Sequence, residues 1–222
     1  MSLPFSLEQF LSVFALYNHS VWPAQILLNI LGILAIVLSA RSNVPSKSIA
    51  GFLGGLWIWT GAVYHIVFFS TINPAASVFG GLFIIQGMLF LYSGVIKTEI
   101  SFGFRSTVKG YTGALLLAYG LVIYPVLGYF LGHVYPNSPT FGAPCPSTIF
   151  TFGLLLWTTT RIRWYLLVIP CLWALVGSSA ALTLGIYEDT GLLISAILGT
   201  AVLTMKRFRD RPIVTIEHAF PG

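Results

Sequence analysis

The sequence predicts an all-α integral membrane protein, a bundle of seven transmembrane helices with an amphipathic helix on the outer face. Three observations predict this fold class. Of the 222 residues, 56% are hydrophobic and only 8% are charged, whereas soluble domains carry about 25% charged residues. Seven apolar segments contain no Asp, Glu, Lys or Arg, and all basic residues fall in alternate connections between them. A chain this poor in charge has to face lipid.

The seven expected spans follow from the length of apolar sequence that a helix needs to cross a bilayer, about 20 residues. The fifth and the seventh are the shortest. The spans comprise residues 21–40, 49–71, 74–96, 110–133, 146–160, 164–185 and 190–205.

The residues before the first span, 1–20, are expected to form an amphipathic helix on the outer membrane interface. Ser6 and Gln9 have the spacing of a capping box at a helix start. Apolar residues then recur at helical spacing, with polar residues between them: Leu7, Phe10, Leu11, Phe14 and Tyr17. Residues 21–205 form the predicted transmembrane domain, and 206–222 a cytoplasmic tail.

The distribution of basic residues predicts the orientation of the chain. They lie after the first, third and fifth spans and in the tail: Arg41, Lys47, Lys97, Arg105, Lys109, Arg161, Arg163, Lys206, Arg207, Arg209 and Arg211. Cytoplasmic connections are enriched in Lys and Arg, so we expect the N-terminus outside and the C-terminus inside a bacterial cytoplasmic membrane. Because the charges are dispersed, we expect no nucleic-acid surface; the partner is the lipid bilayer.

Residues 132–153 are the most informative segment. Four prolines prevent a helix in its first part: Pro136, Pro139, Pro144 and Pro146. The following helix has about fifteen residues before Arg161. It therefore covers roughly 22 Å, less than the roughly 30 Å of hydrocarbon. Irregular backbone at membrane depth has to be buried in protein or line a cavity, so we expect the segment to dip into an outward-facing vestibule.

Cys145 lies at the start of this short helix, where free amide groups and the helix dipole favour a thiolate. A thiolate is a soft ligand for copper(I) or zinc, so a soft metal ion is one candidate cofactor. The alternative is that Cys145 is a small apolar residue filling a rigid turn.

Polar residues within or next to the spans are the other candidates for the vestibule. Such residues usually face the bundle interior, where they bind solutes or only join helices by hydrogen bonds, as His65 and Asn29 could. Glu188 and Asp189 are interpreted as solvating an outer turn, with an external cation bound there as the alternative. The candidate binding residues are His65, Asn73, His133, Cys145, Asn29, Gln86 and Tyr124, of which Cys145, His65 and His133 are also candidate metal ligands, although their spacing matches no compact zinc motif.

Two segments resemble a bacterial membrane protein family that is catalogued only as a domain of unknown function. One is residues 133–156, with its Pro144-Cys145-Pro146 stretch, and the other is residues 59–69 together with 72–75. The resemblance implies a polytopic bacterial membrane protein. It implies no activity and no catalytic residue.

The leading functional hypothesis is a small transporter or permeation protein whose vestibule receives a small solute or a soft metal ion. Nucleotide-binding loops, metalloprotease motifs and paired carboxylates within spans are absent from the sequence, which favours a protein that is not an enzyme. Two alternatives stay open. One is an accessory subunit with a membrane partner or a second copy, and the other is a thiol or redox enzyme that uses Cys145.

Overall fold

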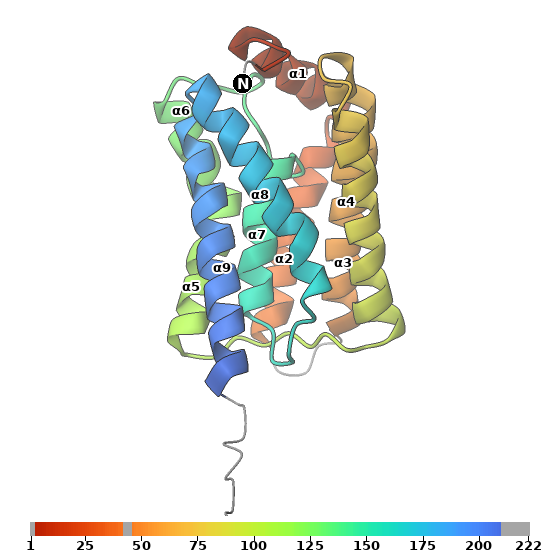
Figure 1. Ribbon diagram of the computed structural model, residues 1–222, viewed down its shortest axis with the longest axis vertical. Coiled ribbons are helices and arrows are strands. Elements are labelled where there is room, and N and C mark those ends of the chain that lie inside the picture. Colours follow the sequence, from red (N-terminus) through yellow and green to blue (C-terminus); the bar gives the residue numbers. More distant parts are fainter. Residues whose placement is uncertain (1–2, 42–45, 210–222) are drawn as a thin grey trace, which may run out of the picture.

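The fold is described by a computed structural model, which covers residues 3–41 and 46–209. Over these residues the chain forms helices and no β-strand, which confirms the all-α prediction. Most helices run along the long axis of the molecule, and the first helix lies across one end (Figure 1).

The helix boundaries lie within a few residues of the predicted ones. The first half of the chain contains α1 (Leu7–Ser20), α2 (Ala24–Ala40), α3 (Ser46–Trp59), η1 (Thr60–Phe68), η2 (Phe69–Thr71), α4 (Ala76–Phe90) and η3 (Leu91–Ile96). The second half contains α5 (Val108–Ala118), η4 (Tyr119–Ile123), α6 (Tyr124–Phe130), α7 (Pro144–Leu156), α8 (Tyr165–Leu184), η5 (Tyr187–Asp189) and α9 (Thr190–Arg209). The expected seventh span thus continues to Arg209, and the predicted tail from residue 210 onward lies outside the described residues.

Several helices are suited to crossing a membrane, but the predicted count of seven spans is not confirmed. Four continuous helical segments of the described residues are long and apolar enough: Ser46–Thr71, Ala76–Ile96, Val108–Phe130 and Tyr165–Leu184. Helices α1 and α2 pass the same test only as a pair, and they are bent by 87°. Helix α7 is shorter still, with 13 residues.

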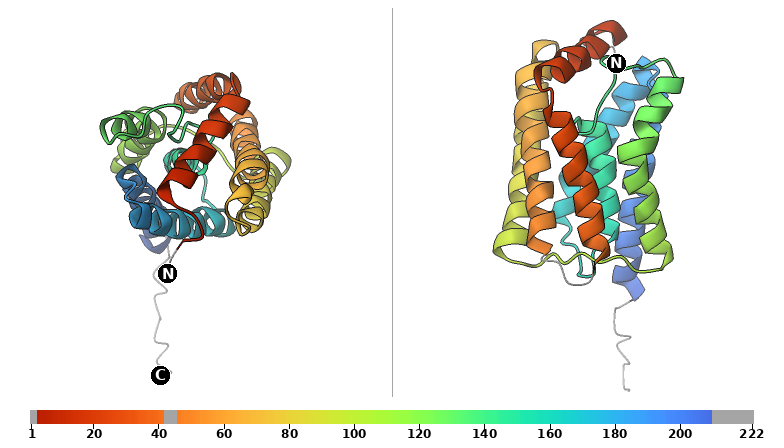
Figure 2. Two further views of the ribbon diagram at one scale, coloured as in Figure 1. Left: turned by 90° about the horizontal axis from the view of Figure 1, so that it is seen from above. Right: turned by 180° about the vertical axis from the view of Figure 1, so that it is seen from behind.

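Helix α7 occupies the middle of the bundle, with the longer helices around it (Figure 2). All 13 of its residues are buried. At 1.5 Å per residue it is roughly 20 Å long, so it does not need to match the thickness of the hydrocarbon. Pro144 and Pro146 stand in its first turn, where a missing N–H removes no helical hydrogen bond. The short fifth span of the sequence is therefore a core helix, enclosed by protein.

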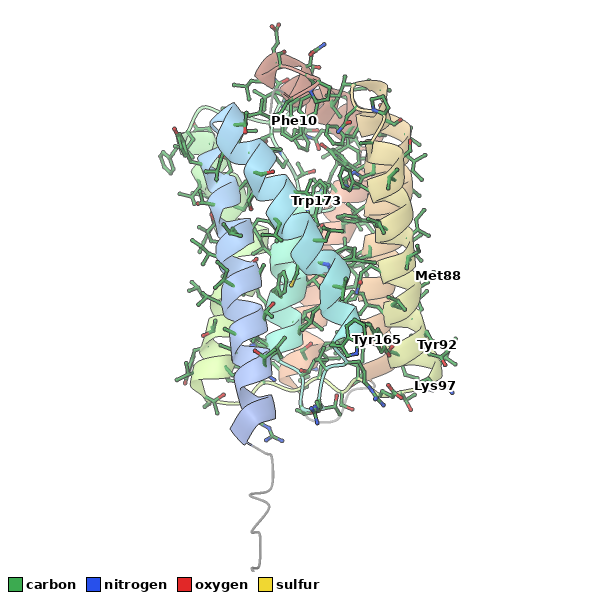
Figure 3. All side chains as sticks on the ribbon, viewed as in Figure 1. Phe10, Met88, Tyr92, Lys97, Tyr165 and Trp173 are labelled. Carbon is green, nitrogen blue, oxygen red and sulfur yellow. The ribbon has the colours of Figure 1, made fainter. Side chains whose placement is uncertain are left out.

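The two ends of the bundle differ in composition. The C-terminal end of α2, the start of α3, residues 97–107, residues 157–164 and the end of α9 all lie at one end, which we call the basic end (Figure 1). Lys97 marks it in Figure 3. Helix α1, residues 72–75, residues 131–143 and η5 lie at the opposite end, which we call the α1 end. Within residues 3–41 and 46–209, the sorting of basic residues along the sequence is thus also a sorting in space.

Helix α1 covers the α1 end of the bundle. It starts with the predicted capping box: the Ser6 hydroxyl accepts from the Gln9 amide, and the Gln9 side chain accepts from the Ser6 amide. Its apolar side packs onto the ends of the other helices, so that Val13, Phe14 and Tyr17 are buried. The amphipathic pattern was expected to place this face in the lipid interface. In the structure it faces protein, because the ends of η1 and η2 supply an aromatic surface beneath it.

Candidate functional site

A cavity of about 120 Å³ lies beneath α1, at the α1 end of the bundle. Its walls are mainly apolar and include several aromatic rings: Phe5, Phe10, Phe14, Tyr64, Phe69, Phe79 and Trp173 line it. Figure 3 shows Phe10, which belongs to α1, at the α1 end. Trp173, which belongs to α8, lies closer to the basic end. The exposed Ser179 also lines the cavity, so the cavity reaches the surface of the protein.

Small residues of α8 leave room for this cavity. Gly177, Ala180 and Ala181 lie on the wall that α8 contributes. A methyl group at Gly177 would come within 3.0 Å of Leu192 and 3.2 Å of the Trp173 ring. The glycine therefore allows the Trp173 ring to lie close to the helix that carries it. Larger side chains along this stretch would fill the space.

Asp189 and Cys145 are buried polar groups in the cavity wall. The Tyr124 hydroxyl donates a hydrogen bond of 2.5 Å to Asp189 Oδ1, and the Cys145 thiol lies beside the same carboxyl group. Asp189 is 2% exposed. Burial raises its pKa to about 7, and the contacts with Tyr124 and Cys145 only partly oppose this effect. Asp189 can therefore exchange a proton near neutral pH.

Glu188 is turned away from the cavity toward His133. Its Oε1 atom lies 2.6 Å from His133 Nδ1, and the Tyr119 hydroxyl donates a 2.8 Å hydrogen bond to its backbone carbonyl. Its Oε2 atom is buried without a hydrogen-bond partner. Glu188 is only 1% exposed. The expectation that Glu188 and Asp189 solvate an outer turn is wrong, because α6 and α7 pack over the turn and replace the water.

Residues 7–212 match the Family of unknown function (DUF6064). The chain belongs to this family. The match confirms the family resemblance of the sequence, and it covers all the residues that surround the cavity except those before α1. No curated protein and no solved structure matches the chain. The family carries no assigned function, so the function of this member has to be argued from its own residues.

The structure brings some of the predicted site residues together at the cavity. Asn73 and Cys145 line it. Tyr124 does not line it, but its hydroxyl donates a hydrogen bond to Asp189, which does. His133 is connected through Glu188. The α1 end of the bundle therefore joins residues as distant in the chain as Leu3 and Asp189 at a single site.

His65 lies behind the wall of the cavity. Its ring centroid is 4.6 Å from that of Phe83 and 4.9 Å from that of Trp173. Neither ring nitrogen has a hydrogen-bond partner, although the side chain is fully buried. The suggested bond between His65 and Asn29 is therefore absent, and Asn29 instead donates to the Gln25 carbonyl of its own helix at 2.8 Å.

Gln86 is a structural link rather than part of the cavity wall. Its side-chain amide donates a 3.1 Å hydrogen bond to the Leu166 carbonyl, which joins α4 to α8.

The candidate metal ligands do not converge at one site. Within the described part of the chain, no three His, Cys, Asp or Glu side chains form a group that could hold a metal ion, so Cys145, His65 and His133 are not one ligand set. The predicted Cys145 thiolate has a carboxyl neighbour instead of a positive charge.

Sequence reasoning missed Asn18, which fixes the proline-rich segment to α1. Its side-chain amide donates to the carbonyls of Pro136 and Ser138, at 2.7 and 2.8 Å, and its oxygen accepts from Thr140 at 2.8 Å. Asn18 is fully buried. A polar residue at the end of an otherwise apolar helical face was the only signal in the sequence. The three bonds hold residues 136–140 against the C-terminal end of α1.

Proposed function

We propose that this protein is a polytopic membrane protein of seven helices in the bacterial cytoplasmic membrane. In this proposal the α1 end faces outward and the basic end faces the cytoplasm. Support comes from the confinement of basic residues to one end, because cytoplasmic connections are enriched in Lys and Arg. Large apolar side chains on the outside of the bundle also support it, for example Ile30 and Val78, which are 55% and 66% exposed.

Its proposed activity is that of a small transporter or permeation protein which receives a small solute at the α1 end. The observation that carries this proposal is the cavity beneath α1, which reaches the surface and has the titratable group of Asp189 in its wall. Ligand sites are concave and mostly apolar, with a few polar groups that fix orientation. The cavity has this composition. It also lies at the end that would face outward, where a solute arrives.

A filled cavity should abolish solute movement. Ala180→Phe places a ring into the cavity from α8, whereas Leu182→Phe adds a ring on the same helix at a position that is 56% exposed. We expect proteoliposomes with the wild type to take up at least one of glycerol, urea, acetate and tetramethylammonium about tenfold faster than protein-free liposomes. Ala180→Phe should return the rate to that of protein-free liposomes, and Leu182→Phe should not. Stopped-flow light scattering measures these rates.

Two results would contradict the proposal. One is a wild type that moves none of the four probes faster than protein-free liposomes do. The other is equal rates in Ala180→Phe and Leu182→Phe, which would show that the movement does not pass through the cavity.

A further inference from the structure

The cavity walls present aromatic rings from α1, η1, η2, α4 and α8. Helix α1 contributes Phe10 and Phe14, η1 and η2 contribute Tyr64 and Phe69, and α8 contributes Trp173. The rings pack against one another, with centroids 4.9 Å apart for Phe10 and Phe14 and 5.3 Å apart for Phe14 and Tyr64. Aromatic faces carry negative electrostatic potential and attract cations within about 6 Å of the ring centroid.

The ionisable groups of the cavity are acidic or neutral. Asp189 is the carboxyl group in the lining, and no Lys or Arg belongs to the lining formed by the described residues. The neighbouring carboxyl group is Glu188, and His133 is the basic group in contact with it. An ionised Asp189 therefore lies in an apolar site next to a second acid. A buried carboxylate without a countercharge is costly, so a positively charged occupant would stabilise it.

We propose that the cavity binds a small organic ammonium ion, with the cation against the aromatic rings and its charge balanced by the Asp189 carboxylate. This inference rests on the proposed role of the cavity as the solute site. Tyr124 and Cys145 contact the carboxyl group, and because a carboxylate has about four acceptor positions, room for a further contact remains. Aromatic walls with one carboxylate suit a cation that is too apolar to remain fully hydrated.

The size of the cavity limits the occupant. Its volume is about 120 Å³, and an apolar protein cavity of about 150 Å³ holds benzene. The occupant is therefore an ammonium ion with only a few carbon atoms, such as a methylated or short-chain amine. Tetramethylammonium is a suitable probe, and tert-butanol is its neutral analogue of nearly the same shape.

Calorimetric titration of the purified full-length protein in mild detergent tests the proposal. At pH 8 we expect the wild type to bind tetramethylammonium about tenfold more tightly than tert-butanol, a difference of about 1.4 kcal/mol, because the aromatic rings and the carboxylate attract only the cation. Asp189→Asn keeps the shape of the side chain and removes its charge, so the preference for the cation should disappear. Glu188→Gln is the matched control, because Glu188 is the adjacent carboxyl group outside the cavity lining, and the preference should persist.

A second readout uses the wild type alone and does not depend on how a variant folds. The affinity for tetramethylammonium should fall about tenfold between pH 8 and pH 6, as Asp189 takes up a proton, while the affinity for tert-butanol stays constant. The titratable groups that face Asp189 are Tyr124, Cys145, Glu188, His133, Tyr119 and Tyr64. Because His133 contacts the neighbouring Glu188, the fall has to persist in His133→Gln.

The outcomes separate this inference from the proposed function. Equal or tighter binding of tert-butanol, or a cation preference that survives in Asp189→Asn, would overturn the ammonium assignment and leave the cavity as a site for neutral solutes. If neither probe binds the wild type, the cavity is not a solute site, and both proposals fail. Selective binding of the cation without flux in proteoliposomes would support the binding site and contradict transport.

Discussion

Glu188 and Asp189 are neighbours in the chain, yet their carboxyl groups meet different surroundings. Glu188 lies 2.6 Å from His133, so an ion pair is available to it. Asp189 faces the Tyr124 hydroxyl and the Cys145 thiol in the cavity wall, and it has no basic partner in the described contacts. The difference arises because consecutive residues of a tight turn point in different directions. The chain thereby holds one carboxyl group that is paired and one that is free to bind a ligand.

The raised pKa of Asp189 predicts a pH-dependent stability. Its pKa is about 7 in the folded protein, against an ordinary value of 3.8 for an aspartate. The folded state thus holds a proton that the unfolded state has lost, so stability falls as the pH rises from about 4 to about 7. Each pKa unit corresponds to about 1.4 kcal/mol, which limits the loss to about 4 kcal/mol. We expect the melting temperature in detergent to fall between pH 5 and pH 8, and to fall less in Asp189→Asn. Identical pH profiles would contradict this account.

At the scale of elements, α1 owes its position to two kinds of contact. Its aromatic side chains stack on η1 and η2, as in the contact of Phe14 with Tyr64 at 5.3 Å. Its last turn is held by polar bonds, among them the Trp59 indole donating to the Tyr17 hydroxyl at 3.0 Å, and the Asn18 bonds to residues 136–140. The apolar contacts are adaptable, whereas the hydrogen bonds have fixed geometry. Together the two kinds of contact fix α1 across the end of the bundle.

The packing of α3 and η1 against α4 depends on facing glycines, which allow two helices to approach closely. A methyl group on Gly87 would lie 2.6 Å from the Gly54 carbonyl, and one on Gly61 would lie 2.6 Å from the Gly80 carbonyl. Backbone atoms cannot move aside as a flexible side chain can. These glycine pairs therefore fix the distance between the two helices and the position of the aromatic residues that they carry.

Two alanine substitutions on α4 should show this dependence. Gly87→Ala forces the helices apart and should destabilise the protein by about 1–3 kcal/mol, as overpacking does. Gly81→Ala is the matched control, because a methyl group there meets nothing within 4 Å, and alanine favours a helix by about 1 kcal/mol over glycine. Thermal unfolding in detergent should show a lower melting temperature only for Gly87→Ala. Equal effects of the two substitutions would exclude close packing as the cause.

At the scale of the whole molecule, the polar and apolar surfaces are arranged for a bilayer. Large apolar side chains point outward along the bundle, as Leu27, Ile33 and Ile85 do with exposed fractions of 57%, 55% and 53%. The polar groups of the α1 end described above lie instead in the interior of the bundle. Because no water is available in the hydrocarbon, exposed side chains there have to be apolar, while functional polar groups face the interior.

The proposed orientation can be tested with single cysteines at the two ends. Tyr187 lies in η5 and is 62% exposed, and Lys97 lies at the basic end. In a background with Cys145→Ala and Cys171→Ala, we expect a membrane-impermeant maleimide to label Tyr187→Cys in intact cells. Lys97→Cys should be labelled only after permeabilisation, because the basic end faces the cytoplasm in the proposed orientation. The reverse pattern would mean that the chain is inserted the other way round.

The sequence alone determined the helical class, the approximate limits of the long helices, the capping box of α1 and the sorting of basic residues. These features are local. The length of an apolar segment, the spacing of capping residues and the charge of a connection can each be recognised in a short stretch of sequence. The sequence also pointed to the segment around Pro144 and Cys145, because the helix that follows the prolines is too short to cross a bilayer by itself.

Only the tertiary structure decided what surrounds each side chain. It enclosed α7 in the bundle, folded α1 over the cavity and turned Asp189 from a loop residue into a buried acid. It also separated His65 from Asn29 and kept Cys145, His65 and His133 from forming one ligand set. These outcomes depend on contacts between residues distant in the chain, such as Asn18 with Ser138. The environment of a polar group is set by the helices that pack against it. The sequence pattern of its own segment does not show which helices these are.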